Sequence, residues 1–298
     1  MDYKKKPKAT EQKRKEPRFA GSSIEEQRGT KQRAFVKLWN VLYPVLAYFV
    51  LMNVVIYMEA LFFHFNHEKY AQYYMMLQTV AGVVSIPFVY SFYRRDKLYA
   101  TSFHQRTSRQ ASQFKNTKQN IVNALETLLC GAVAGIALNN IIALTNLSAE
   151  SAGYQEVTAQ FFAGAVIFEL LGACLIIPLV EELLYRGVVY ARMQDLVERK
   201  VAAILSALLF GAFHFNLVQF IYAGILGLLM TACLEKSHHL YGAIFAHMGA
   251  NFTSILRAET NLFDWMNAGR GIYAVATTVA LVICILLLMP KFSTKMNP

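Results

Sequence analysis

The sequence predicts an all-α fold, a polytopic membrane bundle of about eight transmembrane helices. Of the 298 residues, 55% are hydrophobic and only 16% are charged, against roughly 25% charged residues in soluble domains. Long apolar runs also recur along the chain. Several of these runs reach the length of about 20 residues that crosses the hydrocarbon core of a bilayer.

Five runs are long enough to span a membrane as single helices. They are Leu38–Phe65, Gln72–Tyr93, Ile121–Leu147, Val157–Val180 and Gly271–Met289. Three shorter segments interrupted by glycine and histidine complete the predicted eight: Val201–Phe215, Phe220–Leu234 and Leu240–Leu256. Pro178 should kink or break the fourth helix, because proline lacks a backbone N–H and clashes with the preceding turn.

The chain divides into four predicted regions. Residues 1–37 hold twelve Lys/Arg and five Asp/Glu, and we expect a disordered cytosolic tail that binds anionic lipid and not nucleic acid. Residues 38–156 form N-terminal membrane helices, 157–256 form the core with the polar motifs, and 257–298 form the last helix and a short tail. No signal peptide precedes the first helix, which is expected to serve as an uncleaved anchor.

The distribution of positive charge predicts the topology. With eight helices, 26 of the 29 Lys and Arg residues fall on the side of the amino terminus. Because Lys and Arg concentrate on the cytosolic side, both termini should be cytosolic. The expected location is the cell membrane. No internal repeat is visible, which argues against a transporter.

Three short motifs place polar side chains inside the apolar C-terminal half. A charge at the centre of a bilayer costs about 2.5–3.5 kcal/mol on insertion scales, so such residues are functional candidates. The candidates are Glu181, Glu182 and Arg186 in the first motif, Phe210 and His214 in the second, and His247 and Asn251 in the third.

The spacing within the first motif predicts separate tasks for its two acids. Glu182 and Arg186 are four residues apart with the acid first, the favourable order for an ion pair on a helix. Glu181 points about 100° away and is left free. A free carboxylate that is partly buried suits a general base.

The other two motifs should converge on Glu181. A helical hairpin with its tip near residue 197 brings Glu181 and His214 to the same height, with Phe210 one turn away as a shield. His247 and Asn251 share a helix face, about 12 Å beyond the turn near His239 at the helical rise. Their donors would then face the oxygen that becomes negative when water attacks a carbonyl.

Together the motifs Glu-Glu-x-x-x-Arg, Phe-x-x-x-His and His-x-x-x-Asn resemble those of the CPBP family of intramembrane proteases. This family includes the CAAX prenyl endopeptidase and bacteriocin-processing or self-immunity proteins. The resemblance covers about residues 157–256. It implies that Glu181 and His214 activate water, that His247 and Asn251 stabilise the oxyanion, and that Glu182, Arg186 and Phe210 support them.

The resemblance also implies an endopeptidase acting near the cytosolic face on a membrane-associated or lipidated peptide, by a metal-independent mechanism. No cofactor is expected. Zinc is the alternative, although the string at His67-Glu68 has Ala71 where a zinc HExxH motif needs histidine. Two other hypotheses stay open: a non-catalytic membrane binder or self-immunity protein with the same fold, and a proton-coupled transporter.

Overall fold

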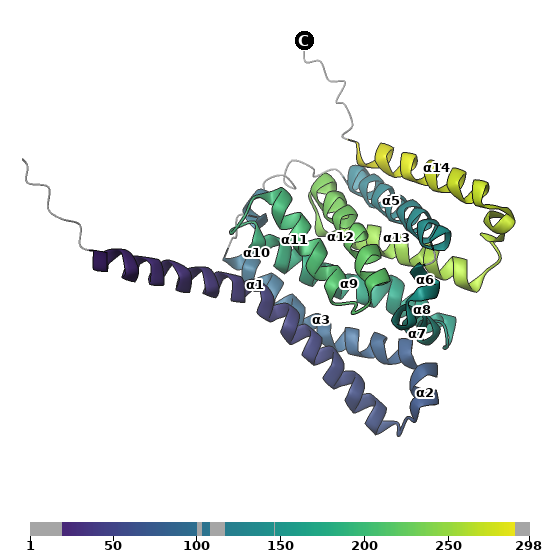
Figure 1. The fold of residues 1–298 in the computed structure, drawn as a ribbon, viewed down its shortest axis with the longest axis horizontal. Helices are drawn as coiled ribbons and strands as arrows, with labels where there is room; N and C mark the ends of the chain where they lie inside the picture. Colours follow the sequence, from purple (N-terminus) through teal and green to yellow (C-terminus); the bar gives the residue numbers. More distant parts are fainter. Residues whose placement is uncertain (1–19, 100–102, 108–116, 146, 290–298) are drawn as a thin grey trace, which may run out of the picture. The chain divides into compact units, whose positions relative to one another are not determined.

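The computed structural model describes residues 20–99, 103–107, 117–145 and 147–289 (Figure 1). These residues contain no strand, which confirms the all-α fold class. Residues 40–298 form one compact unit that holds all the predicted site residues. The helices are α1 (Ala20–Phe62), α2 (His67–Gln72), α3 (Tyr74–Leu98), α5 (Thr117–Leu144), α6 (Leu147–Glu150), α7 (Ala152–Phe161), α8 (Val166–Leu171), η1 (Gly172–Ile176), α9 (Ile177–Leu184), η2 (Tyr185–Tyr190), α10 (Ala191–Met193), α11 (Arg199–Ala212), α12 (Leu217–Ser237), α13 (Leu240–Glu259), η3 (Asp264–Ala268) and α14 (Arg270–Leu288).

Five of the described helices are long and apolar enough to cross a membrane. They are Phe35–Phe62 within α1, and α3, α5, α12 and α14. A sixth is present if α7 and the run Val166–Met193 count as one broken span. The chain is therefore an integral membrane protein, and the expected count of eight spans is not confirmed. α11, for example, has 14 residues, or about 21 Å of helix, which is shorter than the hydrocarbon core of about 30 Å.

The fourth predicted span, Val157–Val180, is not one helix. α7 ends at Phe161, α8 begins at Val166, and the two parts meet at an angle of 107°. Gly164 lies in the break, where an added Cβ would stand 2.7 Å from the backbone oxygen of Gln72. The chain turns where a residue without a Cβ can approach the end of α2. The apolar composition continues through the turn, so the sequence pattern did not mark it.

Pro178 does not break the helix that carries the first motif. The backbone widens into the π-helix η1 just upstream, and the proline then lies in the first turn of α9. Proline is tolerated in a first turn because its missing N–H would have no partner there. A second π-helix, η2, follows α9. Glu181 and Glu182 thus lie between two π-helical segments, which are frequent at functional sites.

The first helix begins earlier than expected. α1 starts at Ala20, whereas residues 1–37 were expected to be a disordered tail. Residues 20–37 include many Glu, Gln, Arg and Lys residues, which are good helix formers, so the helix extends from the apolar run into polar sequence. Residues 1–19 of the expected tail lie outside the described part of the chain.

Small residues allow α13 to lie directly against α5, as Figure 1 shows. A Cβ added at Gly131 of α5 would stand 1.8 Å from the carbonyl oxygen of Ala246. One added at Gly249 of α13 would stand 2.1 Å from the carbonyl oxygen of Leu128. Close backbone contacts of this kind are common between membrane helices. Because His247 lies between Ala246 and Gly249, this contact fixes its position.

Candidate active site

The innermost part of the site is the ion pair between Glu182 and Arg186. Nη1 of Arg186 lies 3.1 Å from Oε1 of Glu182, and both side chains are 0% exposed. Arg186 also donates to the carbonyl oxygen of Gly227 on α12 at 2.9 Å. Its guanidinium lies over the ring of Phe210, 4.7 Å from the centroid. The pair predicted from the spacing is therefore present, and it joins α9 and η2 to α11 and α12.

His247 lies between the two glutamates. Its Nδ1 is 2.9 Å from Oε1 of Glu182, and its Nε2 is 3.8 Å from Oε2 of Glu181. The carboxylate of Glu182 that pairs with Arg186 accepts hydrogen bonds, so the proton of a neutral imidazole belongs on Nδ1. Nε2 then presents a lone pair towards Glu181. The 3.8 Å separation is too long for a direct hydrogen bond, which leaves both atoms able to bind a water.

Phe210 organises the two imidazoles. Its ring meets those of His214 and His247 edge to face, with centroid distances of 5.1 and 5.7 Å. Nδ1 of His214 is 3.0 Å from the carbonyl oxygen of Phe210. A carbonyl only accepts, so this contact places the proton of a neutral His214 on Nδ1 and leaves Nε2 as an acceptor. The structure thus brings His214 and His247 into contact with the same aromatic ring.

Glu181 is the more accessible of the two acids. Its side chain is 17% exposed, whereas that of Glu182 is 0% exposed. Glu181 is therefore the carboxylate that a substrate or a water molecule can reach. Tyr48 of α1 lies within electrostatic range of Glu181 and is itself 8% exposed. Sequence reasoning missed Tyr48, because it lies in a long apolar run with no polar pattern around it.

Asn251 was expected to donate to the oxyanion, but in the structure it donates a hydrogen bond to the backbone. Its Nδ2 donates to the carbonyl oxygen of Ala173 in η1 at 2.7 Å, so one of its two amide hydrogens is used by the backbone. The residue shares a helix face with His247, as predicted from the i,i+4 spacing. The hydrogen bond ties α13 to the π-helix that leads into α9. One amide hydrogen is left for another acceptor.

With this arrangement established, the sequence can be compared with known families. Residues 163–253 match the family model described as Rce1-like, type II CAAX prenyl endopeptidase. The chain contains an Rce1-like domain. This match confirms the resemblance to the CPBP family of CAAX proteases, and all the predicted site residues, from Glu181 to Asn251, lie within it. Neither a curated protein nor a solved structure matches the chain.

The Rce1-like domain begins in the break between α7 and α8 and ends within α13. Two helices that precede this domain in the chain pack against it. α1 contributes Tyr48 near Glu181, and α5 packs against α13. The catalytic core predicted at residues 157–256 is therefore slightly longer than the matched segment. The family supports a protease that acts within the membrane.

The described residues contain no group of three or more His, Cys, Asp or Glu side chains arranged to hold a metal ion. Within the Rce1-like domain, Nδ1 of each site histidine already has a protein partner. The four cysteines are free thiols, three of them buried, where they pack as small hydrophobic side chains. A mechanism without metal stays a prediction, which treatment with chelators would test.

Proposed function

We propose that this chain is an intramembrane endopeptidase that hydrolyses a peptide bond with a water molecule activated by Glu181 and His214. One observation supports this most directly. The reachable carboxylate of Glu181 lies 3.8 Å from Nε2 of His247, and the buried pair of Glu182 and Arg186 holds that imidazole in place. A site with a free base and a fixed imidazole suits general-base hydrolysis.

The proposed reaction starts with a water that donates one hydrogen to Glu181 and another to Nε2 of His214. Glu181 takes the proton as the water oxygen attacks the carbonyl carbon of the scissile bond, and returns it to the leaving amine. His247 can donate to the oxyanion only as an imidazolium, a form that the carboxylate of Glu182 would stabilise. Asn251 would supply the second oxyanion donor.

The proposed substrate is a membrane-associated or lipidated peptide cleaved near the cytosolic face. The match to CAAX prenyl endopeptidases supports this class of substrate. We also propose that both termini are cytosolic, in the cell membrane, and that the basic N-terminal segment binds anionic lipid. The concentration of Lys and Arg in residues 1–37 and 94–118 supports both proposals.

The direct test uses purified protein in nanodiscs and quenched fluorescent peptides that carry a lipidated cysteine near the C-terminus. The proposal expects cleavage at one bond, identified by mass spectrometry of the products. A protein that binds these peptides tightly yet leaves them intact would instead be the non-catalytic binder considered from the sequence. Dependence of any activity on an ion gradient would indicate a transporter.

Asn251→Ala should lower turnover by roughly 10²–10³-fold with little change in the Michaelis constant, as removal of one oxyanion donor does. Thermal melting of the same sample shows how much the lost hydrogen bond to Ala173 matters for stability. Steady-state kinetics at a temperature well below the melting point measured for the variant then report on chemistry alone. Intact turnover with a sharply higher Michaelis constant would place Asn251 in substrate binding instead.

Chelators should leave the purified enzyme active at pH 7. Glu181 and the two imidazoles can activate water without a Lewis acid, and no zinc motif is present in the sequence. The measurement is peptide cleavage before and after treatment with EDTA and 1,10-phenanthroline, followed by dialysis. Activity that is lost on chelation and restored by zinc would show that Glu181, His214 and His247 are metal ligands.

A further inference from the structure

A surface hollow of about 630 Å³ lies on the last part of α3. In the described part of the chain its lining residues run from Pro87 to Tyr99, the C-cap of α3. They recur at spacings of three and four residues, so they form one face of the helix. α3 is long and apolar enough to cross a membrane. It lies outside the Rce1-like domain, so no motif of the candidate active site accounts for this hollow.

The hollow has an apolar end and a basic end. Pro87 and Tyr90 form the end that lies deeper along α3, and Arg94 follows Tyr90 by one helical turn. The side chains of Tyr90 and Tyr99 are 48% and 80% exposed. Tyrosine is enriched where a membrane meets water, and arginine at the end of a membrane helix turns its charge towards that interface. The hollow therefore passes from the hydrocarbon into the region of the lipid headgroups.

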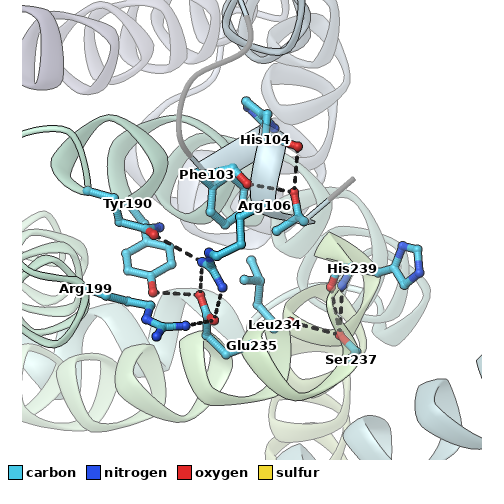
Figure 2. Close-up of polar contacts among 11 residues, drawn as sticks. Phe103, His104, Arg106, Tyr190, Arg199, Leu234, Glu235, Ser237 and His239 are labelled. Atoms are coloured by element: carbon cyan, nitrogen blue, oxygen red, sulfur yellow. Dashed lines mark hydrogen bonds and ion pairs between the residues drawn. The ribbon is translucent and has the colours of Figure 1, made fainter. Parts of the chain in front are cut away.

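Three other arginines of the described chain already have acidic partners. Figure 2 shows Arg106 and Arg199 pointing to one carboxylate, that of Glu235. The contact of Arg106 is bidentate, with N···O distances of 2.6 and 2.7 Å. Arg192 holds Asp96 in the same way, at 2.6 and 2.9 Å. Each of these three guanidinium groups is therefore engaged by a carboxylate of the protein itself.

Arg94 and Arg95, which line the hollow, are different. Both are exposed, and neither forms an ion pair with a described carboxylate. Arg95 is nevertheless held in place, because it donates to the hydroxyl of Tyr43 on α1 and its guanidinium lies over the ring of Phe92, 5.5 Å from the centroid. The rings of Tyr43 and Phe92 meet edge to face at 5.5 Å. A fixed guanidinium without a carboxylate partner suits a phosphate, whose oxygens match its fork of donors.

The remaining polar groups at this end of α3 indicate the net charge of the ligand. The hydroxyl of Ser91 donates to the carbonyl oxygen of Phe88 at 2.7 Å, so the arginines supply the donors. Lys97 is exposed and adds positive charge, whereas Asp96 is buried and paired with Arg192. A zwitterionic headgroup would bring its own cation against these charges. The hollow therefore favours a phosphate ester with a net negative charge.

We propose that this face of α3 binds one anionic phospholipid. Arg94 and Arg95 bind its phosphate, and Pro87 and Tyr90 contact an acyl chain. The site differs from the general attraction of residues 1–37 to anionic lipid, because it is one place on a folded helix with both a basic and an apolar end. The proposal goes beyond the peptidase activity and does not depend on it.

The test measures binding of dioleoyl phosphatidylglycerol and dioleoyl phosphatidylcholine to the purified full-length protein in detergent by native mass spectrometry. Wild type should bind one phosphatidylglycerol at least about tenfold more tightly than phosphatidylcholine, through charge-assisted hydrogen bonds to a headgroup without a cation. Arg94→Gln combined with Arg95→Gln should lose this preference. Tyr43→Phe keeps the ring but releases Arg95, and should weaken the preference in part. Melting curves show whether each variant is folded, and Tyr43→Phe decides the question if the arginine variant is not.

Lys69→Gln combined with Lys200→Gln is the matched control. Both lysines are exposed and neither lines the hollow, and the variant loses the same amount of charge as the arginine variant. It should keep the preference for phosphatidylglycerol. An equal loss in both variants would indicate attraction by net charge alone and overturn the site, as would equal binding of the two lipids by wild type. Inorganic phosphate that displaces the lipid as effectively as short-chain phosphatidylglycerol does would assign the hollow to free phosphate and also overturn the proposal.

Discussion

Glu181→Gln should abolish peptide hydrolysis while leaving a folded protein in the membrane. The amide keeps the shape of the side chain but cannot take a proton from water, and loss of a general base lowers rates by about 10²–10⁴-fold. Glu181 makes no hydrogen bond within the described residues that folding depends on, and Nε2 of His247 lies 3.8 Å from its Oε2. Single-turnover kinetics on a fluorogenic peptide measure the change.

Glu169→Gln is the matched control for this experiment. Glu169 is a second buried carboxylate on the same stretch of helix, 0% exposed, and neither of its oxygens has a hydrogen-bond partner among the described residues. It makes no contact with the site histidines, so its amide variant should turn over at the wild-type rate. Near-wild-type turnover by Glu181→Gln would remove Glu181 from the role of base.

Arg186→Ala should act mainly on stability. It leaves Glu182 as a buried carboxylate with no cation, and breaking a buried pair from one side costs about 3–5 kcal/mol. The variant also loses the hydrogen bond to the carbonyl of Gly227 and the contact with the ring of Phe210. We expect low abundance in the membrane and a strongly reduced melting temperature, measured by thermal aggregation in detergent.

Arg199→Ala serves as the comparison for Arg186→Ala. Its guanidinium pairs with Glu235 at 3.2 Å, but the side chain is 57% exposed, and exposed pairs contribute about 0–1 kcal/mol. The two alanine variants should therefore differ clearly in abundance and melting temperature. An Arg186→Ala protein that is as abundant and heat-resistant as wild type, yet inactive, would assign Arg186 to substrate binding or chemistry.

The parts of the site that sequence could predict are those set by helical periodicity. Glu182 and Arg186 are four residues apart on one helix, and the structure pairs them. Phe210 and His214 are also four residues apart, and their rings are in contact. In both cases the backbone alone determines the neighbour. The three motifs in their order also predicted the resemblance to the CPBP family, which the match over residues 163–253 confirms.

The parts that sequence could not predict depend on contacts between distant elements. The 107° bend between α7 and α8 lies in a run that stays apolar throughout, so composition gave no sign of it. The partner of Asn251 is a backbone carbonyl, that of Ala173, and backbone atoms are present at every position. The bond from His247 to Glu182 was also missed, because i,i+4 spacing explained Glu182 through Arg186 alone.

The measurement that tests the central claim most directly is comparative peptidomics of membranes that contain either wild type or Glu181→Ala at equal abundance. If the chain is an endopeptidase with Glu181 as base, one set of peptides should be shortened at a defined bond only where wild type is present, and the intact forms should accumulate with the variant. Identical peptide profiles in the two membranes, with both proteins folded, would contradict the account.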